Sequence, residues 1–251
     1  APVQSLSNLI QGCIWIWIHL ILCNVSNQAR AKEEDEINRP WRPLPSGRIT
    51  IGQAFTLRWV MVVFCIVWSA AYGAEMILVT LGLVATTLFH DDAGFSNHPV
   101  GKNLCNVGGY TTIEVGATRI MANQGSLDSI SIQAILLSAL VIFTTIQAQD
   151  FPDVEGDSAI KRVTFPIYAP EFSRLFTLTV ISLWSLLLCW LWDIECFIAV
   201  PYVSLGIYVG SRYYFLRTQT ADRYSYIIFN VSFSGSISDS LGFLIISCRH
   251  G

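Results

Sequence analysis

Long apolar runs separated by short polar segments constrain this chain more than any other feature. Hydrophobic residues make up 53% of the sequence and charged residues only 13%, and each run is long enough to cross a bilayer, which takes about 20 helical residues. A backbone N–H or C=O group in lipid finds no hydrogen-bond partner outside the protein, so only helices or a closed β-barrel can span the bilayer. A barrel would show short strands of alternating polarity, so we expect helices. The expected spans are 5–29, 51–72, 74–90, 101–121, 126–148, 171–191, 195–216 and 223–247. The sequence predicts an all-α, polytopic membrane bundle of about eight transmembrane helices that forms a single domain over residues 1–251.

The distribution of Lys and Arg predicts the orientation of these spans. If the helices alternate in direction, the connections near 30–50, 90–101, 149–170 and 217–222 lie on one side of the membrane, and most of the basic residues lie in or beside them. The opposite side has little beyond Arg119 and Arg249. By the positive-inside rule the basic side is cytosolic. We therefore expect an integral membrane protein of the endoplasmic reticulum with both acid-rich loops facing the cytosol.

Composition excludes several other classes of function. The seven cysteines form no CxxC pair, and most lie inside apolar runs, which is typical of small core residues rather than of metal ligands or disulfides. No basic, aromatic-interleaved patch indicates nucleic-acid binding. No obligate protein partner is evident either, so the lipid bilayer and a small-molecule substrate are the partners that we expect.

Three acids follow the fifth expected span at a helical spacing. Asp150, Asp153 and Asp157 stand at i, i+3 and i+7, which places them on one face if the segment is an α-helix. Carboxylates grouped in this way repel one another unless a cation lies between them, and oxygen ligands suit Mg²⁺. Pro152 lies between two of the acids and is able to bend the helix. The pattern predicts a magnesium site that binds a phosphate ester at the membrane surface.

The first polar loop carries a second group of acids, followed by cations. If the first helix continues through this loop, Asn27, Glu34 and Asp35 point within about 80° of one another. The helix should stop near residues 38 and 39, because a proline follows and further prolines set a stiff turn. Arg39, Arg42 and Arg48 on that turn are placed to bind an anion. Either loop taken alone is equally compatible with a solvated connector, but two such loops on one side favour a shared diphosphate site.

The two loops resemble the signature motifs of the UbiA superfamily of intramembrane prenyltransferases. The residues that carry the resemblance are Asn38-Arg-Pro-Trp-Arg-Pro-Leu-Pro-Ser-Gly-Arg-Ile-Thr50 in the first loop, and Asp150-Phe-Pro-Asp-Val-Glu-Gly-Asp157 followed by Lys161, Thr164 and Pro166 in the second. The resemblance extends over nearly the whole chain. It implies a UbiA-like bundle of nine helices around a large cavity, of which the helices here are the second to the ninth. A first helix is then expected to be missing from this sequence.

The first motif also departs from the superfamily pattern, which runs Asn-Asp-x-x-Asp-x-x-x-Asp. This chain has Asn27, Gln28, Ala31 and Asp35 at those positions, so two of the three acids are replaced. Glu34 is the better placed substitute for the acid missing at position 31, because it lies at i+3. This form of the motif is similar to that of the fungal branch of UbiA-type terpene cyclases, which includes the sesquiterpene cyclase of the fumagillin pathway.

The resemblance implies a role for each polar residue. Mg²⁺ would be held by Glu34, Asp35, Asp150, Asp153 and Asp157, and these four aspartates would also be the catalytic acids that bring the metal to the diphosphate. The substrate-binding residues would be Asn27, Arg39, Lys102, Lys161 and Arg162, and the prenyl chain would lie in an apolar cavity that excludes water from a carbocation.

Polar groups inside the expected spans suggest a further role. Glu114 lies near the middle of the fourth span, where an acid is costly and normally faces a cavity or a partner. It could quench a final cation or orient the substrate, or it could pair with Arg119 or a neighbouring helix. Asp239 in the last span has the same two interpretations. His90 and the acids that follow it could bind a cation, but a solvated helix end is the simpler interpretation.

Three functions remain open from the sequence. The first is a Mg²⁺-dependent terpene cyclase that ionises a prenyl diphosphate, with farnesyl diphosphate as the expected substrate, and releases diphosphate and a sesquiterpene. The second is an intramembrane prenyltransferase that joins the prenyl group to an aromatic or quinone-precursor acceptor. The third is a non-enzymatic scaffold or lipid-binding protein, which the replaced acids of the first motif would allow but the complete second motif disfavours.

Overall fold

The computed structural model describes residues 3–123 and 126–231, and every structural statement below concerns these residues. The chain divides into two compact units. The first unit comprises Ala1–Ala139 together with Ala159–Arg162, and the second comprises Leu140–Ser158 and Val163–Gly251. Each unit is described by itself, and the single domain expected from the sequence stays a prediction.

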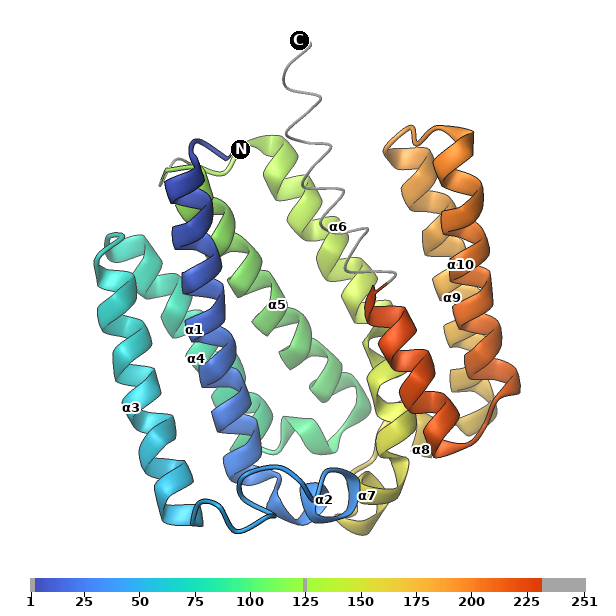
Figure 1. Ribbon diagram of the computed structural model, residues 1–251, viewed down its shortest axis with the longest axis horizontal. Helices are drawn as coiled ribbons and strands as arrows, with labels where there is room; N and C mark the ends of the chain where they lie inside the picture. Colours follow the sequence, from blue (N-terminus) through green and yellow to red (C-terminus); the bar gives the residue numbers. More distant parts are fainter. Residues whose placement is uncertain (1–2, 124–125, 232–251) are drawn as a thin grey trace. The chain divides into compact units, whose positions relative to one another are not determined.

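Four long antiparallel helices make up most of the first unit. They are α1 (Leu6–Arg30), α3 (Ile51–Ala70), α4 (Ala74–Asp91) and α5 (Pro99–Met121), and they pack side by side in Figure 1. The short helices α2 (Lys32–Asn38) and η1 (Phe95–Asn97) lie in the connections, and α6 (Ser129–Thr145) begins in this unit. Because the long helices alternate in direction, the end of α1, the start of α3, the end of α4 and the start of α5 share one end of the unit.

Local sequence signals explain where several of these helices begin. Thr50 caps α3 in a capping box with Gln53, which satisfies backbone donors at the helix start. Gly73 has a φ of 101°, a conformation that favours glycine, in the tight turn between α3 and α4. Pro99 occupies the first position of α5, where its missing N–H costs nothing.

The core of the first unit combines close packing with a buried polar network. Trp15 is fully buried and packs with Met76 and Ile120. The helix that carries Ile120 approaches closely because of Gly116, where an added Cβ would come within 2.3 Å of the Trp15 ring. The Trp15 indole N–H donates to Ser69 Oγ at 2.9 Å, so the polar edge of the ring also has a partner.

The second unit is built around a pair of packed helices. These are α9 (Pro170–Leu191) and α10 (Cys196–Phe215), which run side by side in Figure 1. The segment η2 (Ile146–Asp153), helix α7 (Val154–Ala159) and helix α8 (Phe165–Tyr168) precede them, and residues 219–231 are also helical. Gly210 lets α10 approach α9, since a Cβ there would lie 2.9 Å from Leu178 Cα.

The all-helical architecture expected from the sequence is confirmed for the described residues. Each of the first seven expected spans coincides with a long helix, while most of the eighth, 223–247, lies outside the described residues. Five helical segments of the described chain are long and apolar enough to cross a membrane: Leu6–Arg30, Ile51–Ala70, Ala74–Asp91, Ser129–Ala159 and Pro170–Leu191. The finer count of eight transmembrane helices stays a prediction.

Candidate functional site

The first motif lies on a broken helix, which corrects one expectation from the sequence. α1 ends at Arg30, and Ala31 leaves helical geometry with φ −98° and ψ 24° before α2 begins. The Ala31 N–H still donates to the Asn27 carbonyl at 3.0 Å, so the chain bends without losing this hydrogen bond. Asn27 and the two acids therefore lie on different helices rather than on one continuous face. α2 ends at Asn38, as the following proline predicts.

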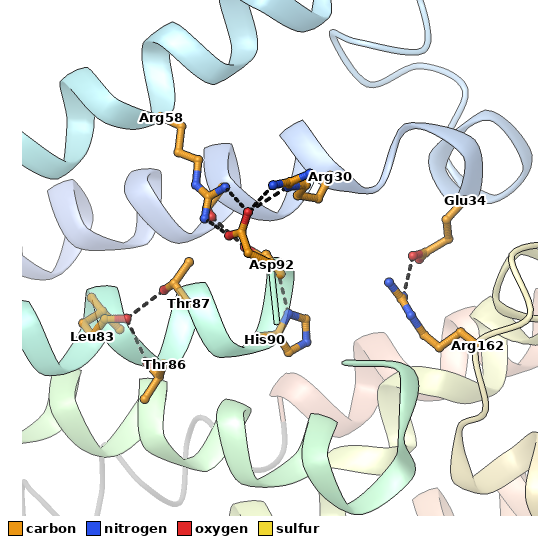
Figure 2. Close-up of polar contacts among 11 residues, drawn as sticks. Arg30, Glu34, Arg58, Leu83, Thr86, Thr87, His90, Asp92 and Arg162 are labelled. Atoms are coloured by element: carbon orange, nitrogen blue, oxygen red, sulfur yellow. Dashed lines mark hydrogen bonds and ion pairs between the residues drawn. The ribbon is translucent and has the colours of Figure 1, made fainter. Parts of the chain in front are cut away.

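Both acids of α2 are buried and paired with arginines. Asp35 is fully buried, and its two carboxylate oxygens accept from Arg42 Nη1 at 2.7 and 2.9 Å. Glu34 Oε2 accepts from Arg162 Nη1 at 2.5 Å, a contact drawn in Figure 2. Arg39 Nη1 lies 3.7 Å from Glu34 and 3.8 Å from Asp35. Burial raises the pKa of the Asp35 carboxyl, and the hydrogen bond from Arg42 opposes that rise.

A second ion-pair cluster ties three helices together at the same end of the first unit. Asp92, directly after α4, accepts hydrogen bonds from Arg58 of α3 and Arg30 of α1 (Figure 2). The Arg58 side chain is only 2% exposed, so its charge depends on this carboxylate. Asp91 accepts from Ser26 at 2.6 Å and from the His90 ring at 2.7 Å. The acids at the end of α4 are therefore engaged within the protein rather than solvated.

The second motif lies in the second unit, on a segment that changes helix type. Residues up to Asp153 are 3₁₀-helical and include Pro152, and the α-helical geometry of α7 begins at Val154. The single α-helical face expected for the three acids is therefore wrong in detail, because proline cannot supply an N–H to an α-helical turn. Asp150 and Asp157 are buried and Asp153 is partly exposed.

Aromatic and cationic groups brace the second motif, and the sequence analysis missed this brace. Phe151 packs against the Tyr213 ring, with centroids 5.2 Å apart, and against the Arg174 guanidinium at 4.6 Å. Arg174 in turn donates to both oxygens of Asp222 at 3.1 and 3.0 Å. The Pro152 carbonyl accepts from a glutamine side chain at 3.2 Å. An arginine near the start of an apolar helix, with an acid on a later segment, was the signal that could have found these contacts.

The remaining predicted site residues of the first unit lie on α1, on α5 and in the second loop. Lys102 is buried near the start of α5, and Asn27 is half-buried at the end of α1. Lys161 adopts a positive φ of 59° in the loop. Glu114 Oε1 accepts from Ser138 of α6 at 2.5 Å, and its Oε2 is buried without a hydrogen-bond partner among the described residues.

The two motifs differ in how well their side chains suit a metal ion. Within the described ranges, no three His, Cys, Asp or Glu side chains are grouped closely enough to hold a metal by themselves. Mg²⁺ commonly binds through one or two carboxylates with substrate phosphates and water completing its shell, so the acids of the second motif suit it chemically. The first motif suits it poorly: Ala31 offers no ligand, and both oxygens of Asp35 already accept from Arg42.

Comparison with known proteins decides the family. A model described as the UbiA prenyltransferase family matches residues 1–234. The chain belongs to this family. Fumagillin beta-trans-bergamotene synthase af520 of Aspergillus fumigatus is 32% identical over 200 residues, which is 79% of this chain and 68% of that protein. Diterpene cyclase eriG of Hericium erinaceus is 26% identical over 231 residues, covering 90% of this chain and 72% of the cyclase. Polyprenyl transferase eriF of the same fungus is 28% identical, covering 67% and 58%.

Solved UbiA structures share the fold. A UbiA homolog from Archaeoglobus fulgidus bound to GPP and Mg²⁺ superposes with a TM-score of 0.64 at 16% identity, covering 97% of this chain and 89% of that one. Family membership and the apolar helices together identify an integral membrane protein. The chain is therefore a UbiA-type enzyme, a terpene cyclase or a prenyltransferase.

Proposed function

We propose that this UbiA enzyme is a Mg²⁺-dependent terpene cyclase that ionises farnesyl diphosphate and cyclises the farnesyl chain to a sesquiterpene. The observation that carries the proposal is the 32% identity to a bergamotene synthase over 79% of the chain, together with a complete second motif. The alternative is transfer of the prenyl group to an aromatic or quinone-precursor acceptor. It is favoured by the similarity to a polyprenyl transferase.

The acids of the second motif would hold the metal. Asp150, Asp153 and Asp157 are carboxylates on one short segment directly after an apolar helix, and a buried carboxylate is costly without a cation nearby. Bound Mg²⁺ supplies charge stabilisation to the departing diphosphate. The brace around Phe151 holds this segment in place through Arg174 and Asp222.

Cationic side chains would neutralise the rest of the diphosphate charge. Arg39 and Arg162 lie with the acids of the first motif, and Lys102 and Lys161 are further candidates. Asn27, at the break between α1 and α2, would orient the same group. The positive charge of the four cationic side chains supports these assignments. The proposed site faces the cytosol of the endoplasmic reticulum, following the positive-inside pattern.

Glu114 would act after ionisation. A cyclisation ends when a base removes a proton from the last carbocation, and a carboxylate inside an apolar helix bundle is suited to this step. The Ser138 hydroxyl holds one carboxylate oxygen at 2.5 Å and leaves the other for the proton. We expect Glu114→Gln to change the products toward prematurely quenched alcohols or alkenes rather than to abolish diphosphate release.

Product analysis tests the proposed function. Membranes containing the full chain are incubated with Mg²⁺ and with C10, C15 or C20 diphosphate separately, and the extracts are analysed by gas chromatography and mass spectrometry. The proposal requires a cyclic hydrocarbon from the C15 substrate without any acceptor, and its loss in EDTA. Slow hydrolysis alone, with product formation only after an aromatic acceptor is added, would establish the transferase instead.

Matched variants test the metal-binding residues. Asp157→Asn and Asp153→Asn remove one charge each and should lower turnover at least 100-fold, since a metal ligand acts on the transition state. Glu155→Gln removes the same charge from an exposed position on α7 and serves as the control. Full activity in either aspartate variant would remove that residue from the metal site. In the first motif, Glu34→Ala should cost more than Glu33→Ala, because Glu34 is buried and Glu33 is exposed.

A further inference from the structure

Arginine side chains contact both acids of the first motif. Three guanidinium groups, those of Arg39, Arg42 and Arg162, lie against the two carboxylates of Glu34 and Asp35. Both acids of the motif are therefore already engaged by guanidinium groups. A carboxylate that binds Mg²⁺ must offer its oxygens and its charge to the metal instead.

The geometry gives each acid a different task. Asp35 is completely buried, and its two oxygens accept from one Arg42 nitrogen at 2.7 and 2.9 Å. This pair fixes the proline-rich turn to α2. Glu34 is held between Arg162 at 2.5 Å and Arg39 at 3.7 Å. A metal that took the Asp35 carboxylate would break its ion pair with Arg42 at a fully buried acid, which is strongly unfavourable. A metal that took Glu34 would compete with its contacts to Arg162 and Arg39.

We propose that the first motif of this chain binds the substrate anion through arginines and does not bind a metal ion. Glu34 and Asp35 are positioning residues, and Arg39 and Arg162 are the anion-binding residues. The Arg39 side chain is 28% exposed and that of Arg162 is 10% exposed, so both retain surface for a ligand. Guanidinium groups suit diphosphate because their N–H groups match phosphate oxygens in pairs.

The proposal rests on the proposed function for the identity of the anion, which is a diphosphate. It separates the two motifs chemically: the second motif uses a metal, whereas the first uses fixed cations. The proposal explains two observations together. Gln28 and Ala31 stand where the family pattern has acids, and the remaining acids pair with arginines. In this motif, guanidinium groups would bind the diphosphate in place of a metal ion.

Anion binding without metal provides the first test. Inorganic pyrophosphate is titrated against the purified full chain in detergent with EDTA present, by isothermal calorimetry. Arg162→Gln and Arg39→Gln should each weaken pyrophosphate binding about ten-fold or more, as expected for loss of a charge-assisted hydrogen bond. Lys32→Gln is the control, because Lys32 lies on α2 but is exposed and pairs with the exposed Glu36. Unchanged affinity in both Arg162→Gln and Arg39→Gln would overturn the proposal.

Metal counting provides the second test. Bound Mn²⁺ is measured by electron paramagnetic resonance with farnesyl thiodiphosphate, an unreactive analogue, in wild type, Glu34→Gln, Asp35→Asn and Asp157→Asn. The proposal predicts the wild-type number of Mn²⁺ ions in both first-motif variants, and thermal unfolding checks that each is folded. Loss of an ion in folded Glu34→Gln or Asp35→Asn would overturn it. Retention of all ions in Asp157→Asn would instead contradict the metal site of the proposed function, while the EDTA titration still decides the role of the arginines.

Discussion

The ion-pair cluster around Asp92 gives the most quantitative prediction. Arg58 is 2% exposed and relies on Asp92 for its counterion, with Nη1 donating to Oδ1 at 3.1 Å. Asp92→Asn preserves the shape of the side chain but leaves the Arg58 charge buried and uncompensated. Breaking a fully buried pair costs about 3–5 kcal/mol. Because Asp92 itself is 26% exposed, we expect a loss of roughly 2–4 kcal/mol.

The assay is thermal unfolding of the purified chain in detergent, and the control is an exposed pair of the same chemistry. For a chain of this size 1 kcal/mol shifts Tm by about 2–4 °C, so Asp92→Asn should lower Tm by roughly 4–16 °C. Glu171→Gln removes a carboxylate that also accepts two hydrogen bonds from one arginine, Arg217, but the two side chains are 73% and 44% exposed. That variant should shift Tm much less than Asp92→Asn does, because solvent screens an exposed ion pair. Equal shifts in the two variants would refute the reasoning.

The same cluster predicts a pH dependence. Hydrogen bonds from Arg58, with a smaller contribution from Arg30, lower the pKa of the Asp92 carboxyl. A group with a lowered folded-state pKa contributes stability that is complete above its unfolded value, about 3.9, and is lost as the pH falls through the folded value. The Tm difference between wild type and Asp92→Asn should therefore be constant near neutral pH and shrink below about pH 4. A difference that grows on acidification would contradict this assignment.

Two further predictions concern packing and the brace of the second motif. Gly116→Ala should destabilise the first unit by about 1–3 kcal/mol, because the added Cβ overlaps the buried Trp15 ring. Gly52→Ala is the control, because open space surrounds that position, and it should be neutral or slightly stabilising in the same thermal assay. Similar losses of stability in both variants would exclude overlap as the cause. Asp222→Asn should release Arg174 and loosen the second motif, raising the Mg²⁺ concentration for half-maximal activity, and an unchanged Mg²⁺ requirement would show that the brace does not position the acids.

The sequence predicts the long helices well because their signals are local. Apolar length decided where each span lies, and the helix starts near positions 51 and 74 follow from a capping box and a glycine turn. The end of α2 follows from the next proline. These features depend on a few neighbouring residues, so no knowledge of the rest of the chain is needed.

The details of the site depend on partners far away in the sequence, which is why they were not predicted. Glu34 pairs with Arg162, 128 residues later. The 3₁₀ geometry around Pro152 is supported by contacts from Phe151 to residues of α9 and α10. Spacing singled out the candidate side chains for the site, which stay a prediction, but it could not show which charges neutralise one another.

The polar network beside Trp15 has a consequence for how the first unit assembles. Ser69 contacts Thr80 at 2.7 Å, and the His19 ring contacts the same threonine at 3.0 Å and the Trp15 carbonyl at 2.8 Å. These groups come from α1, α3 and α4 and satisfy one another away from water. If one helix shifted along its axis by a single turn, several of these polar groups would lose their hydrogen-bond partners while remaining buried. Such a loss costs free energy, whereas apolar side chains could repack against new apolar neighbours at a smaller cost. The polar network thus fixes the axial register of α1, α3 and α4 relative to one another, which their apolar side chains alone would specify poorly.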